Sequence, residues 1–134
     1  MGASNQYRRL WQAEVWLHDL DARQPLVRSF DVDHRFTGDF IHLDIEAHHC
    51  GGHTRGFTFY IYRDALFICD YVFLTSAGMS FNPYGPERET RWQASRIFEV
   101  IANRSLNTVC GYNYVTSFAD WLPLFECLLA ERQV

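Results

Sequence analysis

Four side chains with metal-binding and proton-transfer chemistry alternate along residues 40–48: His42, Asp44, Glu46 and His48. If these residues form one β-strand, alternate side chains point to the same face and the four lie side by side. Imidazole and carboxylate groups are ligands for Mn²⁺, Fe²⁺ and Zn²⁺. The pattern suits a divalent metal site, although the solvated polar face of an antiparallel sheet explains it more economically.

A second group of donors lies in the turn formed by residues 48–53, which is rich in glycine and histidine. Cys50 and His53 have the spacing of a CxxH pair, and Gly51 and Gly52 let the backbone fold around an ion. A closed zinc site takes four ligands, and no second pair lies at the spacing of a zinc motif. We therefore interpret this turn as a hairpin loop with solvated histidines.

Acidic residues are concentrated in the same part of the chain. If residues 25–36 pair with residues 40–48 as a hairpin, five carboxylates form a negative patch: Asp31, Asp33, Asp39, Asp44 and Glu46. Such a patch would steer the protein toward a partner surface rich in basic side chains. Ordinary solubilising charge is the alternative interpretation.

The composition is that of a globular chain. Of 134 residues, 48% are hydrophobic and 16% aromatic, so the chain can bury a core, and we expect one domain over residues 1–134. No apolar run approaches the roughly 20 residues that span a bilayer, and the first residues contain no apolar signal segment. We therefore expect a cytoplasmic protein that does not associate with a membrane.

Cysteine and lysine usage narrows the chemistry further. The four cysteines form no CxxC pair, so we expect free thiols, with Cys69, Cys110 and Cys127 buried and Cys50 in a loop. The net charge is −4, and all 12 basic residues are arginine. The absence of lysine excludes Schiff-base chemistry and a phosphate-binding lysine.

The hydrophobic pattern predicts strands first and helices later. Period-two alternation or apolar runs indicate five strands, at residues 8–20, 25–36, 40–48, 57–63 and 65–74. Helical spacing after Pro86 predicts a helix over residues 87–104, and a capping box at Ser117 predicts a second helix to about residue 131. A short sixth strand fits residues 107–114. We expect an α+β fold, an antiparallel meander of about five strands with two C-terminal helices on one face.

Residues 40–47, FIHLDIEA, resemble the first strand of the DEDD-type exonucleases, in which an apolar run ends in Asp-x-Glu. The resemblance implies that Asp44 and Glu46 hold catalytic metals. It also implies a fold similar to that of ribonuclease H, in which antiparallel strands precede a helix, a short strand and a second helix.

A different segment is similar to the RNA recognition motif. Residues 55–62, RGFTFYIY, resemble its RNP1 octamer, and residues 15–20, VWLHDL, resemble its RNP2 hexamer. The resemblance implies that Trp16, Phe57 and Phe59 are exposed on a sheet, where they stack on the bases of single-stranded RNA.

No complete catalytic signature is present, since the chain contains neither GxSxG nor a P-loop. We therefore expect a non-enzymatic protein without a cofactor that binds and blocks another protein, such as an immunity or anti-defence factor of a bacterium, phage or mobile element. Its acidic strands would mimic nucleic-acid phosphates toward a nucleic-acid-binding target. A metal-dependent hydrolase or nuclease built on residues 42–48 is the second hypothesis, and RNA binding is the third. Aromatic side chains on the sheet would also suit a homodimer.

Overall fold

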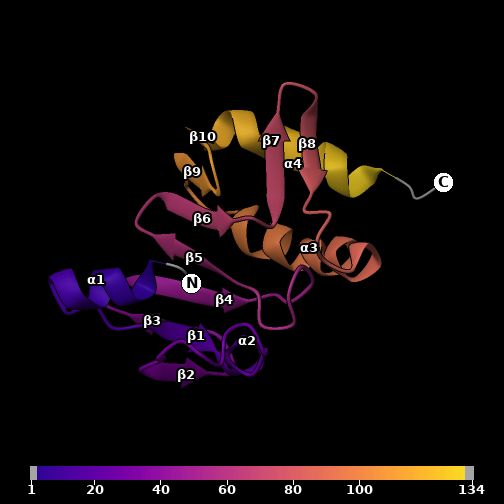
Figure 1. The fold of residues 1–134 in the computed structure, drawn as a ribbon. Coiled ribbons are helices and arrows are strands. Elements are labelled where there is room, and N and C mark those ends of the chain that lie inside the picture. Colours follow the sequence, from indigo (N-terminus) through magenta and orange to yellow (C-terminus); the bar gives the residue numbers. More distant parts are fainter. Residues whose placement is uncertain (1–2, 132–134) are drawn as a thin grey trace.

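A computed structural model describes residues 3–131 of the chain, which form four helices and three β-sheets (Figure 1). The largest sheet has six strands in the order β10 (Val115–Ser117), β9 (Thr108–Gly111), β6 (Ala65–Cys69), β5 (Thr58–Tyr62), β4 (Ile45–His49) and β3 (Phe40–His42). Two-stranded sheets pair β1 (Trp16–His18) with β2 (His34–Phe36), and β7 (Val72–Thr75) with β8 (Gly78–Phe81). The helices are α1 (Ser4–Trp11), α2 (Asp19–Ala22), α3 (Glu87–Ile101) and α4 (Phe118–Ala130).

The large sheet is mixed, which corrects the expectation of a purely antiparallel meander. Strands β3 to β6 follow one another antiparallel, but β9 lies parallel to β6. Between these two strands the chain forms the β7–β8 hairpin and α3. Parallel strands need a long crossover of this kind, whereas short turns force antiparallel pairing. The combination of helices and sheets was expected, but the sheet is larger and more complex than the pattern indicated.

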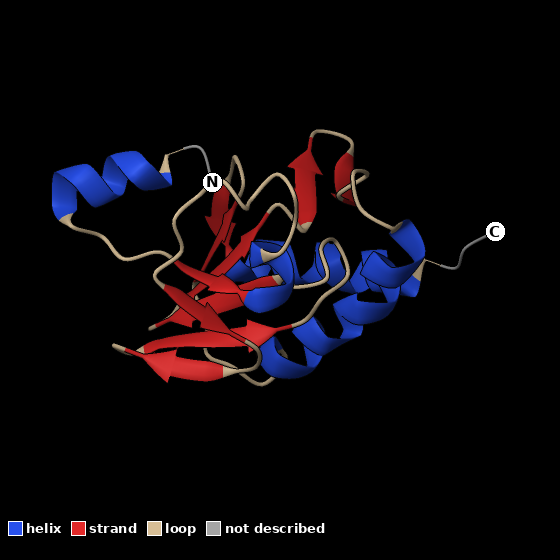
Figure 2. Cartoon of the chain, turned by 60° about the horizontal axis from the view of Figure 1, so that its bottom comes forward, coloured by secondary structure: helices blue, strands red, loops and turns tan. Residues whose placement is uncertain are grey.

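Helices α3 and α4 cover one face of the large sheet (Figure 2). Their apolar sides meet the inward side chains of the strands in one core, which includes Phe59, Ile61, Leu66, Ile68, Ile97, Ile101, Trp121 and Phe125. Helix α3 begins where Pro86 predicts it, and at the start of α4 the Ser117 hydroxyl accepts a hydrogen bond from the backbone N–H of Asp120 at 3.1 Å. Both helix predictions and the strand near residue 110 are confirmed.

The N-terminal part departs most from the expected strands. The predicted strand at 8–20 is replaced by the end of α1, by β1 and by α2, and of the predicted strand at 25–36 only β2 forms. Strands β1 and β2 run parallel in a sheet of their own. Asp33 joins them, because its carboxylate accepts hydrogen bonds from the backbone N–H of Val15 and from Arg8, both at 2.8 Å. These long-range contacts outweigh the local alternation of apolar and polar residues.

Tight turns interrupt two of the other predicted strands. Leu43 and Asp44 have positive φ angles of 48° and 62°, so residues 40–49 form the β3–β4 hairpin and not one strand. Cys69 has a φ of 50° and ends β6, after which β7 begins a separate hairpin. No helix within residues 3–131 is both long enough and apolar enough to cross a membrane.

Candidate metal-binding pair

His53 and Asp70 approach one another at one end of the β5–β6 hairpin. His53 lies in the loop before β5, and Asp70 follows the last residue of β6. The His53 Nε2 atom lies 3.4 Å from Asp70 Oδ2. Hydrogen bonding to His53 is the main cause that lowers the pKa of Asp70, and it outweighs the burial that raises it. Asp70 is therefore ionised at neutral pH beside a histidine that is largely buried.

Asn82, which directly follows β8, fixes this pair from the other side. Its side-chain amide donates to the backbone carbonyl of Asp70 at 2.8 Å and lies 3.3 Å from His53 Nε2. Its backbone N–H donates to the carbonyl of Tyr71 at 3.0 Å. Asn82 is only 3% exposed, and no partner among the described residues bonds the buried His53 Nδ1 atom. The pair is rigidly placed, with one imidazole nitrogen facing the carboxylate.

Two glycines allow the His53 loop to pack this closely. Gly52 has a φ of +98°, and a Cβ atom added there would collide with the Tyr71 hydroxyl and lie 3.0 Å from the Thr90 Cα atom. A Cβ atom on Gly85 would lie 2.7 Å from the backbone oxygen of His53. Both contacts involve backbone or buried groups that cannot move easily, so only glycine fits at these positions.

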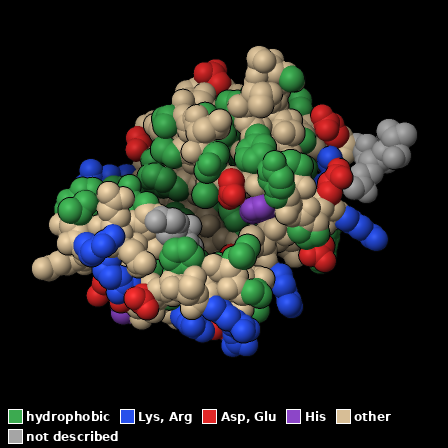
Figure 3. All heavy atoms as spheres, viewed as in Figure 1, with side chains coloured by type: hydrophobic (Ala, Val, Ile, Leu, Met, Phe, Trp, Pro, Cys, Tyr) green, Lys and Arg blue, Asp and Glu red, His purple; other side chains and the backbone are tan. Residues whose placement is uncertain are grey.

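The pair borders a cavity of about 270 Å³. Its walls come from β1, α2, the His53 loop, β5 and the end of β6: Leu17, His18, Asp21, His53, Thr54, Gly56, Phe57, Thr58, Tyr60, Cys69 and Asp70. Burial is the main cause that lowers the pKa of His18, and the neighbouring His49, whose ring centroid is 4.1 Å away, lowers it further. Figure 3 shows an acidic and a histidine side chain side by side at a hollow on this face of the molecule.

Asp21 of α2 holds the loop that carries His53. Its Oδ2 atom accepts a hydrogen bond from the Thr54 hydroxyl at 2.6 Å, and its Oδ1 atom accepts one from the backbone N–H of Gly56 at 2.8 Å. Through these two bonds the N-terminal segment of the chain positions a loop that is more than thirty residues away in sequence.

The four residues that the sequence placed on one strand face are not brought together. The β3–β4 turn puts His42 opposite Ile45, and Glu46 opposite Ile41. His42 lines an aromatic pocket on the outer face of the sheet, whereas Glu46 bonds Arg104, which lies just beyond the end of α3. The four side chains therefore do not share one strand face, because the segment is a hairpin. Asp44 is part of the hairpin turn, and His48 bonds Glu46 at 3.0 Å.

The expected acidic patch is largely neutralised. Three of its five carboxylates are paired with arginine: Asp33 with Arg8, Asp39 with Arg96 and Glu46 with Arg104. Asp39 also accepts the backbone N–H of His49 at 2.8 Å. These three side chains connect separate elements of the fold through ion pairs. They do not join Asp31 and Asp44 in the open negative surface that the sequence predicted.

The thiol of Cys50 turns away from His53 into the core. It donates a hydrogen bond to the carbonyl of Gln93 at 3.2 Å, and burial raises its pKa to about 11. A protonated, buried thiol is a poor metal ligand. The prediction of three buried cysteines is also wrong, because Cys50 is buried whereas Cys69 and Cys127 are exposed.

The structure supports neither of the two family resemblances that the sequence showed. Phe57 and Phe59 are 6% and 0% exposed, so they cannot stack on RNA bases. Trp16 lies in β1, which pairs with β2 in a separate sheet and not with β5. An exonuclease site at Asp44 and Glu46 is equally unsupported, because one residue is in a turn and the other is bonded to arginine.

Histidine and carboxylate side chains are suitable donors for zinc, iron or manganese. Catalytic zinc sites take three protein ligands, however, and no group of three histidine, cysteine, aspartate or glutamate side chains suited to a metal occurs among residues 3–131. His53 and Asp70 therefore fit a metal site in chemistry but supply only part of one. Sequence reasoning noted His53 and missed Asp70, which fell inside the strand predicted over residues 65–74, although an acidic residue in an otherwise apolar run was a usable signal.

Comparison with known proteins gives a result at the level of structure alone. No family model matches the chain, and no curated protein matches it. The crystal structure of VMB-1 at pH 5.5 superposes with a TM-score of 0.73 at 14% identity, over 96% of this chain and 60% of that one. A metallo-β-lactamase from Pontibacter korlensis gives 0.70 at 15%, over 96% and 63%. TTHA1623 in a di-iron-bound form gives 0.64 at 16%, over 92% and 69%.

These matches contradict the expectation of a non-enzymatic inhibitor that needs no cofactor. The similar structures include proteins described as metallo-β-lactamases, and another, TTHA1623, is described in a di-iron-bound form. They agree better with the second hypothesis, a metal-dependent hydrolase. At 10–16% identity the likeness establishes the fold alone. The chain thus has a metallo-β-lactamase-like fold and spans about 60% of the length of the first structures that it matches.

Proposed function

We propose that this chain is part of a metal-dependent hydrolase, in which His53 and Asp70 are two of the ligands of the metal. The observation that carries the proposal is the 3.4 Å approach of His53 Nε2 to Asp70 Oδ2 beside a cavity, in a fold shared with metallo-β-lactamases. Among residues 3–131 no third histidine, cysteine or carboxylate suited to a metal joins the pair.

A metal bound at this pair would act as a Lewis acid and lower the pKa of a bound water. The residues of this chain prepare the pair for that role. The lowered pKa of Asp70 keeps its carboxylate ionised, and Asn82 fixes the backbone next to it through the 2.8 Å bond to the Asp70 carbonyl. Asp21 holds the His53 loop in place, and Tyr60 forms part of the cavity wall that would face a substrate.

Metal binding tests the ligand assignment without depending on catalysis. Purified protein is titrated with Co²⁺ and Zn²⁺, and binding is followed by the visible absorption of Co²⁺ and by metal analysis after dialysis. His53→Ala and Asp70→Asn should each abolish binding, whereas His34→Ala and Asp44→Asn should bind as the wild type does. Equal binding by all five proteins, or none by the wild type, would contradict the assignment.

Hydrolysis is then assayed on the metal-loaded protein with a chromogenic cephalosporin, a phosphodiester and a thioester. Activity that requires metal and is lost in Asp70→Asn supports the proposed function. If the chain binds metal but hydrolyses none of the three substrates, the hydrolase proposal is wrong and the ligand assignment stands alone.

A further inference from the structure

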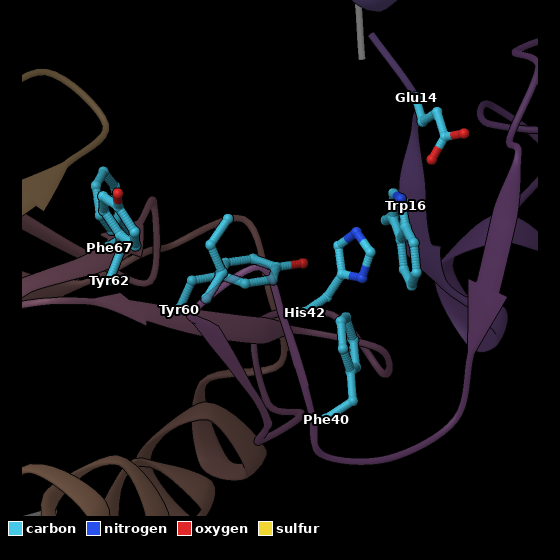
Figure 4. Close-up of a pocket in the computed structure, with 8 residues that line it drawn as sticks. Glu14, Trp16, Phe40, His42, Tyr60, Tyr62 and Phe67 are labelled. Carbon is cyan, nitrogen blue, oxygen red and sulfur yellow. The ribbon is translucent and has the colours of Figure 1, made fainter.

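An aromatic pocket of about 410 Å³ opens on the face of the large sheet that α3 and α4 leave uncovered (Figure 4). On β5, Phe59 and Ile61 point into the core, so the alternating Tyr60 and Tyr62 point to this outer face. The pocket is lined by Glu14, Trp16, Phe40, His42, Ile45, Tyr60, Tyr62 and Phe67. Its volume falls within the range of small-molecule sites, roughly 300–1,000 Å³.

The aromatic wall of the pocket is held in place before any ligand arrives. The Trp16 ring centroid lies 5.4 Å from that of Phe40, 4.6 Å from that of His42 and 4.2 Å from that of His34. Trp16 and Phe40 come from different sheets, so the stack joins β1 to β3. Rings packed in this way lose little conformational freedom when a ligand binds.

The wall of the pocket carries one carboxylate. Glu14 is the charged residue among the eight that line it, and its carboxylate accepts a hydrogen bond from His34 Nε2 at 3.0 Å. The faces of tryptophan, tyrosine and phenylalanine rings are themselves negative, and they attract cations within about 6 Å of the ring centroid. The carboxylate and the ring faces therefore favour the same kind of ligand.

One lining ring already accepts a cation within this chain. The guanidinium carbon of Arg63 lies 5.1 Å from the centroid of the Tyr62 ring. From the aromatic walls and the single carboxylate, we propose that the pocket binds an organic cation. The ligand class is a quaternary or tertiary ammonium group on an apolar body, with the ammonium group against Trp16 and near Glu14. The proposal does not depend on the metal pair or on hydrolase activity.

The test separates charge from shape. Binding of choline and of benzyltrimethylammonium to the full chain is measured by calorimetry and by NMR shifts of the tryptophan indole N–H groups. The probe 3,3-dimethyl-1-butanol has the shape of choline without its charge. We expect both cations to bind at least roughly tenfold more tightly than the alcohol, in line with the strength of cation–π contacts that are partly desolvated.

Variants then locate the site. Glu14→Gln should weaken binding of benzyltrimethylammonium about threefold and Trp16→Leu up to about tenfold. Glu99→Gln and Trp92→Leu change an exposed carboxylate and an exposed ring away from the pocket, and they should leave the affinity unchanged. Equal affinity for choline and the alcohol, or full affinity in both pocket variants, would overturn the proposal. It would also be overturned if the chain were a dimer that Phe67→Asp separates, since the pocket would then be an interface.

Discussion

Arg104 binds Glu46 through two parallel hydrogen bonds, with Nη1 donating to Oε1 at 2.9 Å and Nη2 donating to Oε2 at 2.6 Å. One residue follows α3 and the other lies in β4, so the pair joins the helical layer to the sheet near its edge. The bonds from Arg104 are the main cause that lowers the pKa of Glu46 to about 2, and His48 contributes in the same direction.

Replacing Glu46 with glutamine should lower the free energy of unfolding at pH 7 by about 1 kcal/mol, because the pair is partly exposed to solvent. The folded pKa lies below the ordinary value of 4.5, so this stabilisation is present above pH 4.5 and is lost as the pH falls toward 2. Urea denaturation at several pH values should therefore show the two proteins converging at low pH. Glu99→Gln is the control and should show no such convergence with the wild type. If the free energies of unfolding of the wild type and Glu46→Gln differ by the same amount at every pH, the Glu46–Arg104 pair does not stabilise the fold in this way.

Replacing Gly52 with alanine should destabilise the protein by about 2 kcal/mol or more, because the new Cβ atom meets the Tyr71 hydroxyl and the start of α3 at a positive φ. Gly78→Ala is a matched control, since Gly78 has a φ of +118° but no atom within 4 Å of an added Cβ. Denaturation of both variants separates the steric cost from the backbone cost. Equal destabilisation would show that the packing around Gly52 is looser than described.

The cysteines should differ sharply in reactivity. Cys50 is buried with a pKa of about 11, whereas Cys127 is exposed on α4. The thiolate is the reactive form, so iodoacetamide at pH 8 should modify Cys127 at least roughly tenfold faster than Cys50. Peptide mass spectrometry at successive times measures both rates, and unfolding in urea should make them similar. Rapid modification of Cys50 in the folded protein would contradict its buried position.

The C-terminal half of the fold was predictable because its signals are local. Helix α3 follows Pro86 with apolar residues at helical spacing, and Ser117 caps α4 through its own side chain. The β3–β4 hairpin gave no such signal. Its turn at Leu43 and Asp44 contains no glycine, and a turn of two residues pairs His42 with Ile45 and so shifts the alternation of the two faces by one residue. The unbroken alternation of apolar and polar residues therefore favoured a single strand over the hairpin that forms.

The candidate site is harder to read from sequence because it depends on tertiary contacts. His53 and Asp70 flank the β5–β6 hairpin, so they meet only when β5 and β6 pair antiparallel. The sequence predicted both strands, and an antiparallel pairing of the two would have predicted which residues meet at their common end. Asn82 directly follows β8, a strand that the hydrophobic pattern did not predict. The contact of Asp21 with the His53 loop follows no sequence spacing at all.

Asp21 offers a test of how the His53 loop is held. Asp21→Ala removes the acceptors of the Thr54 hydroxyl and of the Gly56 N–H, so the loop should open more often and the amide of Gly56 should lose protection from hydrogen exchange. If the loop carries a metal ligand, Co²⁺ affinity should also fall by about tenfold to a hundredfold, the effect typical of removing a group that orients a ligand.

Asp19→Ala is the matched control for Asp21→Ala, because Asp19 lies in the same helix and pairs with Arg23 and Arg35 instead of the loop. It should leave both the Gly56 amide and the metal affinity unchanged. Loss of exchange protection without loss of metal affinity would separate the structural role of Asp21 from the ligand role of His53. Retained protection in Asp21→Ala would show that other contacts are enough to hold the loop.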